Sequence, residues 1–221
     1  MGDATTFELT LERIALIRRM VVAWNPVGNG APIVHPDAPY GSADRDDDIF
    51  NVTGDDEGAD EEHRALGDAL ALFLLNAVLK PGRYAYHNTL AKLDSRQVSD
   101  VFFDDATGLS PEHVTFDVTA EHLALIPHLN LEWDVDHDVP GVDPDLPYGA
   151  YAHLTGQMAT LLGIALAKDA EGDAIVPDDL AARLSRLHHE MQPALQIFLR
   201  YADLGPGSFR QPEGRAGWEP V

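Results

Sequence analysis

Four histidine and aspartate residues in the first third of the chain have the side chains best suited to metal chemistry. His35, Asp37, Asp46 and His63 supply imidazole and carboxylate groups, which bind Zn, Mn or Fe in proteins. An open coordination position on such a metal would permit hydrolysis. One hypothesis is therefore a metal-dependent hydrolase or metal-binding protein that holds a divalent metal ion. The sequence contains neither H-E-x-x-H nor H-x-H nor the spacing of a facial triad, which counts against this hypothesis.

A second cluster of carboxylates lies in the middle of the chain. Aspartates alternate with other residues from Asp134 to Asp138, which resembles the start of a calcium-binding loop. Val139 occupies the position where such a loop needs glycine, and Asp145 stands where the bidentate glutamate belongs. A solvated acidic loop is the better interpretation of this segment.

The sequence lacks the common catalytic motifs. The nucleophile elbow G-x-S-x-G, the phosphate loop G-x-x-x-x-G-K-[ST] and the dinucleotide motif G-x-G-x-x-G are absent. The chain also contains no cysteine, so thiol nucleophiles, thiolate metal sites and disulfides are excluded. We therefore predict no catalytic residues and favour a protein that is not an enzyme.

The most distinctive motif, Pro-Asp-x-Pro-Tyr-Gly, occurs twice, at residues 36–41 and 144–149. Proline restricts φ, glycine permits positive φ, and tyrosine offers a flat amphipathic surface. Each loop is either a rigid corner whose tyrosine fills the core, or a recognition surface near a tryptophan. The second interpretation predicts that these residues bind a partner: Trp24, Asp37, Tyr40, Gly41, Trp133, Asp145, Tyr148 and Gly149.

The two motifs belong to a longer internal duplication. Residues 7–25 align without gaps on residues 116–134, and residues 69–82 align without gaps on residues 194–207. The Pro-Tyr-Gly loops lie between these blocks in both copies. Three similar blocks in the same order indicate that one unit was copied in tandem.

This duplication predicts the organisation of the chain. The expected parts are a first unit, a second unit and a C-terminal tail, with the two units packed as one compact pseudo-symmetric body. Their boundaries are 1–108, 109–207 and 208–221. The second unit carries extra residues between Lys168 and Asp179.

Local signals predict mostly helices within each unit. Thr10 and Thr119 precede apolar periodic segments and are expected to cap helices. Pro127 should end or kink the second of these helices early, which leaves residues 129–133 extended. The last helix of the second unit should kink at Pro193. The predicted fold is mainly α, a tandem duplication of a three-helix unit with Pro-rich interhelical loops and minor short β segments.

The net charge of −22 restricts the partners that this protein can have. So negative a chain repels nucleic acid phosphates and anionic membranes, and it favours a basic protein. No apolar run reaches 18 residues, and no signal sequence is evident, so we expect a cytoplasmic protein. Three lysines against twelve arginines also suit a salt-adapted source, which would explain the acidity without any partner.

These observations favour a non-catalytic acidic interaction protein. An adaptor, an inhibitor or an immunity-type subunit of a prokaryotic system would fit, binding its partner through the Pro-Tyr-Gly loops or through acidic faces. A nucleic-acid mimic, in which carboxylates imitate phosphates, is one version of this hypothesis. The sequence leaves a homo-oligomer open, and the metal-dependent hydrolase remains the alternative.

Overall fold

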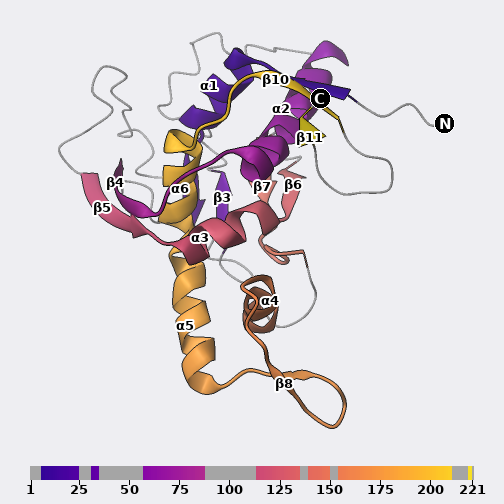
Figure 1. Ribbon diagram of the computed structural model, residues 1–221. Helices are drawn as coiled ribbons and strands as arrows, with labels where there is room; N and C mark the ends of the chain where they lie inside the picture. Colours follow the sequence, from indigo (N-terminus) through magenta and orange to yellow (C-terminus); the bar gives the residue numbers. More distant parts are fainter. Residues whose placement is uncertain are drawn as a thin grey trace.

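Helices and short strands contribute jointly to this fold. The computed structural model describes residues 6–24, 31–34, 57–87, 113–134, 139–149, 154–210 and 219–220 (Figure 1). About half of the described residues are helical and about a quarter are in strands. The predicted mainly α fold with a three-helix unit is therefore wrong. Its strands are too short, between two and six residues, for alternation of apolar residues to reveal them.

The elements follow one another in nearly the same order twice. The helical segments are α1 (Leu11–Arg19), α2 (Glu57–Asn76), α3 (Ala120–Leu125), the 3-10 turn η2 (Ile126–His128), α4 (Leu154–Leu161), α5 (Asp178–His189) and α6 (Met191–Tyr201). The strands are β1 (Thr6–Leu9), β2 (Val22–Trp24), β3 (Pro32–Val34), β4 (Gly82–His87), β5 (His113–Val118), β6 (Leu131–Asp134), β7 (Val139–Val142), β8 (Ala167–Lys168), β9 (Ala174–Ile175), β10 (Gly207–Arg210) and β11 (Glu219–Pro220).

We name residues 6–87 the N-terminal half and residues 113–210 the C-terminal half. Each half begins with a strand and a short helix, continues with a hairpin, and ends with a long helical segment and a strand. In the C-terminal half, the long helical segment is divided into α5 and α6, and α4 with the exposed β8–β9 hairpin precedes it. Figure 1 shows this hairpin and α5 extending away from the rest of the molecule.

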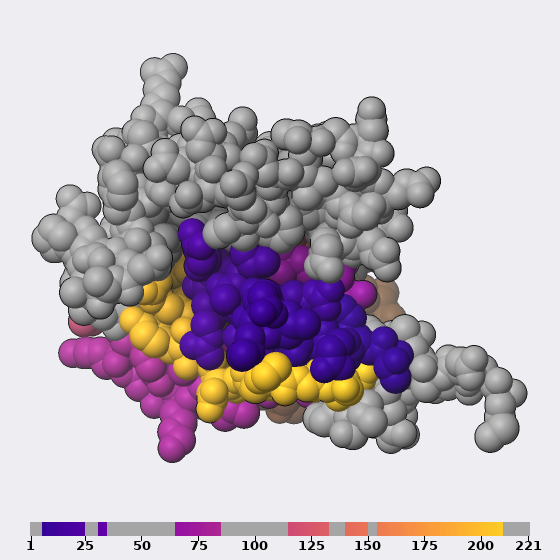
Figure 2. Space-filling model, turned by 90° about the horizontal axis from the view of Figure 1, so that it is seen from above, coloured from indigo at the N-terminus to yellow at the C-terminus, as the bar shows by residue number. Residues whose placement is uncertain are grey.

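The end strands of the two halves pair with each other. Strand β1 pairs antiparallel with β10, which also pairs with β11, and β4 pairs antiparallel with β5. The space-filling view shows the indigo N-terminal segment against the yellow C-terminal segment (Figure 2). The predicted tail therefore begins within β10, and residues 219–220 extend the same sheet.

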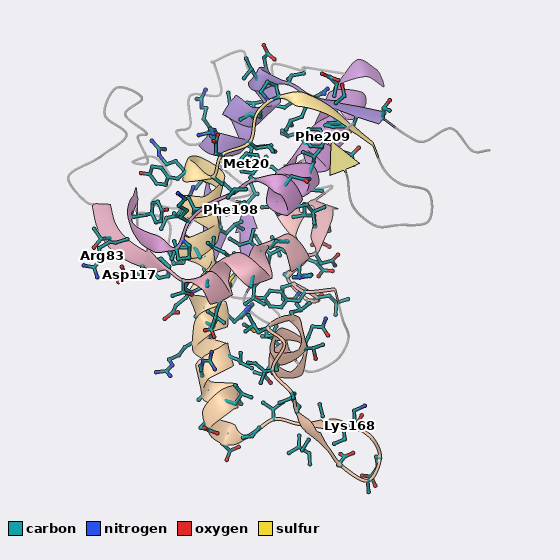
Figure 3. All side chains as sticks on the ribbon, in the orientation of Figure 1. Met20, Arg83, Asp117, Lys168, Phe198 and Phe209 are labelled. Carbon is teal, nitrogen blue, oxygen red and sulfur yellow. The ribbon has the colours of Figure 1, made fainter. Side chains whose placement is uncertain are left out.

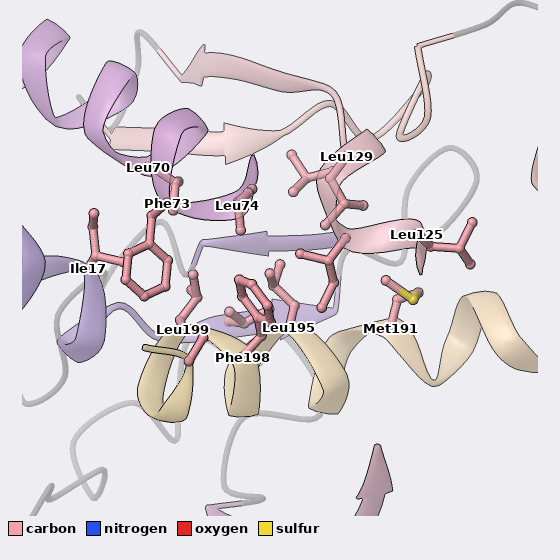
Figure 4. Close-up of a cluster of buried hydrophobic side chains, with 14 of the residues drawn as sticks. Ile17, Leu70, Phe73, Leu74, Leu125, Leu129, Met191, Leu195, Phe198 and Leu199 are labelled. Atoms are coloured by element: carbon pink, nitrogen blue, oxygen red, sulfur yellow. The ribbon is translucent and has the colours of Figure 1, made fainter. Parts of the chain in front are cut away.

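The hydrophobic core lies between the two long helical segments and the hairpins. Phe73 of α2 and Phe198 of α6 meet edge to face, with ring centroids 6.0 Å apart. Ile17, Leu70, Leu199 and other apolar side chains of both halves lie around this pair (Figure 4). An edge-to-face aromatic pair of this kind adds about 0.5–1.5 kcal/mol to the energy of area burial.

Two helix starts and two proline effects agree with the local sequence signals. The hydroxyl of Thr10 accepts from the Arg13 N–H at 3.3 Å, and that of Thr119 accepts from the His122 N–H at 3.3 Å. Helix α3 ends at Leu125, just before Pro127, and β6 follows as an extended segment. The break near Pro193 falls at Glu190, between α5 and α6. A proline ring clashes with the carbonyl four residues earlier, so the break precedes Pro193 itself.

No helix within the described part of the chain is long and apolar enough to cross a membrane.

Candidate functional site

The most distinctive group of polar and aromatic side chains surrounds His188, at the C-terminal end of α5. His188 is buried, with 1% of its surface exposed. The Tyr148 hydroxyl oxygen lies 3.2 Å from its Nδ1 atom, and the Trp24 ring meets the imidazole edge to face at 5.5 Å. The neighbouring His189 is exposed and stacks on Trp24, with centroids 4.8 Å apart and planes inclined by 25°. We call Trp24, Tyr148, His188 and His189 the His188 corner.

Both halves of the chain build this corner. Trp24 ends β2 in the N-terminal half, whereas the other three residues belong to the C-terminal half. The backbone of β2 is held against α6 by two buried glutamines. The Gln196 side chain accepts from the Val22 N–H at 2.8 Å and donates to the Met20 carbonyl, and Gln192 donates to the Val22 carbonyl at 2.8 Å. These bonds fix the strand that presents Trp24.

The loop that presents Tyr148 is a rigid turn. The Asp143 carboxylate accepts from the backbone N–H groups of Asp145 and Leu146, at 2.9 and 2.8 Å. The other carboxylate oxygen of Asp143 accepts from the Asn130 side chain at 3.1 Å. The backbone N–H of Gly149 donates to Leu146, and Gly149 has a φ of 77°, which favours glycine. The turn is thus tied to the residue before β6.

Tyr148 serves this corner as a buried positioning group. Only 5% of its surface is exposed, and burial raises the pKa of its phenol. The hydroxyl therefore stays protonated at neutral pH, and a neutral phenol is a poor nucleophile or base. Its contact with His188 matches the rigid-corner interpretation of the loop, in which the tyrosine fills the core.

The exposed part of the corner has a different character. Trp24 is only partly buried, and His189, Asp145 and Gly149 are exposed. A stacked indole and imidazole can contact apolar, aromatic or cationic groups of a partner. Of the predicted partner-binding residues, the structure thus brings Trp24 close to the turn that carries Asp145, Tyr148 and Gly149.

The remaining predicted residues are not placed in a site. Asp37, Tyr40 and Gly41, together with the metal candidates His35 and Asp46, lie outside the described residues. Trp133 belongs to β6 and His63 to α2, but their side chains are outside the described part of the structure. Within the described residues, no group of three or more His, Cys, Asp and Glu side chains could hold a metal ion.

A second buried histidine was not predicted as a site residue. His122 caps its own helix, because its Nδ1 atom accepts from the Thr119 N–H at 3.0 Å. Its Nε2 atom lies 3.3 Å from a carboxylate oxygen of Glu190, at the break between α5 and α6. Burial lowers the pKa of His122, although the Glu190 carboxylate opposes this effect. The sequence signal was histidine in place of the usual glutamate three residues after a threonine cap.

Comparison of the chain with protein-family models, curated proteins and solved structures found no match. The interpretation of the His188 corner therefore depends on its geometry and on the charge of the chain.

Proposed function

We propose that this protein binds a basic protein partner without catalysing a reaction, and that the exposed rim of the His188 corner contacts that partner. The observation that supports this proposal most directly is the partly exposed Trp24, stacked on the exposed His189 of the corner to which the turn contributes Tyr148. An adaptor, an inhibitor and an immunity-type subunit all fit this description.

Trp24 has the properties of an interface anchor. Tryptophan is enriched among residues whose truncation costs a complex 2 kcal/mol or more. Its ring is already held by His188 and His189, so binding would immobilise little additional side chain. The turn at Asp145 is equally preorganised by the hydrogen bonds to Asp143. A surface of this kind loses little conformational entropy on binding.

The charge of the chain favours the basic character of the partner. A net charge of −22 attracts cationic proteins and accelerates their association, especially at low ionic strength. The exposed imidazole of His189 can in addition donate or accept a hydrogen bond, and the Asp145 carboxylate can accept one. The buried Tyr148 supports the rim from beneath and does not contact the partner in this proposal.

The proposal is tested by affinity capture with matched variants. Immobilised wild type, Trp24→Ala and Tyr201→Ala are incubated with lysate of the source cells, and captured proteins are identified by mass spectrometry. Tyr201 is the control, because it is also an exposed aromatic but lies at the far end of α6. A specific basic protein should be captured by wild type and by Tyr201→Ala, and its affinity for Trp24→Ala should fall about thirtyfold, as a 2 kcal/mol anchor implies.

Two outcomes would reject the proposal. Equal capture by all three proteins would show that Trp24 is not part of the surface. Capture that is unaffected by raised salt would exclude electrostatic attraction, from which the basic character of the partner is inferred.

A further inference from the structure

The two outer strand pairs have the same register in the two halves. Leu9 pairs with Gly207 in one sheet, and Val118 pairs with Gly82 in the other. Leu9 and Val118 are aligned in the duplicated sequence, and so are Gly82 and Gly207. Every residue pair of the shorter ladder, β1–β10, has an aligned residue pair in the β4–β5 ladder. The pair Glu8–Ser208 of the β1–β10 ladder corresponds to the pair Asp117–Arg83 of the β4–β5 ladder. In the same way, Phe7–Phe209 corresponds to Phe116–Tyr84. The pair Thr6–Arg210 corresponds to Thr115–Ala85.

The β1–β10 and β4–β5 ladders also carry polar side-chain pairs at equivalent positions. The Ser208 hydroxyl donates to the Glu8 carboxylate at 2.6 Å, and the Arg83 guanidinium donates to the Asp117 carboxylate at 2.7 and 2.8 Å. Figure 3 shows Arg83 and Asp117 side by side on the β4–β5 ladder. Each ladder thus carries one polar cross-strand pair at the same position.

The helices also pack on the opposite half. Helix α6 contacts β2 and β3 of the N-terminal half, and α2 contacts β6 and β7 of the C-terminal half. Helix α1 contacts α6, and the corresponding η2 contacts α2. Each half therefore supplies the long helix and the end strand that the other half needs.

Equivalent residues meet where the two halves cross. Val78 and Asp203 occupy the same aligned position, and each donates its backbone N–H to the other's carbonyl at 3.0 Å. Phe73 and Phe198 are also aligned with each other, and their rings are in contact. Contacts between equivalent residues are the signature of a two-fold axis, as in an isologous dimer.

We propose that the chain is a fused, strand-exchanged dimer of its two halves, and that a second copy of the chain can replace either half. The exchanged contacts do not require both halves to belong to one chain. In the intact chain, residues 88–112 join the paired ends His87 and His113, so β4 pairs with β5 of the same chain. Without that connection, β4 would pair with β5 of another copy in the same register.

A deletion of residues 88–112 tests this proposal. The deletion joins β4 directly to β5 as one continuous strand, which cannot fold back on itself. When this strand pairs antiparallel with the same strand of a second copy, the β4–β5 register forms twice. In each case, His87 of one copy lies opposite His113 of the other. The matched control replaces residues 88–112 with Asn-Gly, a two-residue turn that allows the hairpin within one chain.

Light scattering at several protein concentrations gives the result. The deletion should produce a folded dimer with twice the mass of the chain, and the Asn-Gly variant should be a monomer with the same circular dichroism. A folded monomer from the deletion would overturn the proposal. An unfolded deletion variant beside a folded control would also overturn it, because the second copy would have failed to supply the pairing.

A second experiment keeps residues 88–112 in case both variants fail to fold. A protease site is inserted in this segment of the full-length chain, and tagged and untagged proteins are cleaved, mixed, unfolded and refolded together. The proposal expects that about half of the refolded molecules combine a tagged half with an untagged half. Refolding without any mixed species would overturn it.

Discussion

Helices α2 and α6 occupy equivalent places in the two halves, yet they are fastened differently. Leu70, Phe73 and Leu74 of α2 align with Leu195, Phe198 and Leu199 of α6, and all six are buried. At two other aligned positions, α6 carries Gln192 and Gln196, whereas α2 has Gly67 and Ala71. The apolar positions that build the shared core are the same. The polar positions differ, and only the pair on α6 bonds to the strand that presents Trp24.

This difference separates the residues that stabilise the whole fold from those that support the His188 corner. Apolar burial at equivalent positions holds both halves together without distinguishing them. The glutamines, Pro193 and Glu190 have no counterparts of the same type in α2, where Gly67, Asp68 and Ala65 stand. These residues belong to the side of the molecule that carries His188.

The largest expected effect tests the equivalence of the two helices. Phe73→Ala and Phe198→Ala should each lower the free energy of unfolding by about 3–5 kcal/mol, because each leaves a cavity against the other ring. The two losses should be similar. The double variant should lose less than their sum, because each single variant already removes the contact between the two rings. Urea unfolding monitored by circular dichroism measures all three. Losses that add fully would show that the rings do not support each other.

The second prediction tests the difference between the helices. Gln196→Met keeps the length of the side chain but leaves the buried Val22 N–H and Met20 carbonyl without this partner. We expect a loss of about 1–3 kcal/mol for each group left unsatisfied. Gln192→Met is the matched control, because it removes a single bond to the Val22 carbonyl, and it should cost less. Equal stability of Gln196→Met and wild type in urea unfolding would contradict the role of this glutamine.

The third prediction concerns a histidine that only one half contains. Arg13 takes the place of His122 in the N-terminal half. Burial holds the pKa of His122 below its ordinary value of 6.5, so the unfolded chain binds the proton more readily. Stability from this residue is therefore complete above pH 6.5 and is lost as the pH falls toward the lowered pKa.

His122→Gln measures that contribution. Glutamine three residues after the cap preserves the capping box with Thr119 but does not titrate. The variant should lose less stability than wild type between pH 6.5 and pH 5 in thermal unfolding, at an unchanged helix content. Parallel curves for the two proteins would show that His122 carries none of the acid sensitivity.

The smallest expected effect compares the two ladders. The ion pair of Arg83 and Asp117 is exposed, and it lowers the pKa of Asp117 through the hydrogen bond from Arg83. Exposed pairs of this kind contribute little and are screened by salt. Arg83→Ala should cause a small fall in Tm at low salt that vanishes at high salt, and Ser208→Ala in the other ladder should be insensitive to salt. A large, salt-independent fall for Arg83→Ala would contradict this assignment.

Local signals in the sequence predicted individual element ends well. Thr10 and Thr119 cap helices through their own side chains, and Pro127 ends a helix by its own geometry, so neighbouring residues suffice for these predictions. Apart from the extended segment that contains β6, the strands were not predicted individually, because they are short and gain their stability from distant partners. Strand β1, for example, has only four residues and pairs with residues two hundred positions away.

The candidate site was predictable only in part, for a related reason. The duplicated aromatic motifs predict Trp24 and Tyr148 as partner-binding residues, and the structure buries Tyr148 against His188. Their proximity to one histidine was not predictable, since they come from different halves. A duplicated sequence is equally compatible with halves that close on themselves and with halves that exchange strands. The contacts of His188 depend on which of these occurs.

Disulfide trapping distinguishes these two arrangements most directly, because the chain contains no cysteine of its own. Exchanged halves place residue 8 opposite residue 208 and residue 83 opposite residue 117. Closed halves would instead place residue 8 opposite residue 83, and residue 117 opposite residue 208. Four variants with two cysteines each cover these pairs, for example Glu8→Cys with Ser208→Cys. The account predicts that the 8–208 and 83–117 disulfides form on mild oxidation of the folded monomer and the other two do not. Formation of the 8–83 and 117–208 disulfides instead would contradict it.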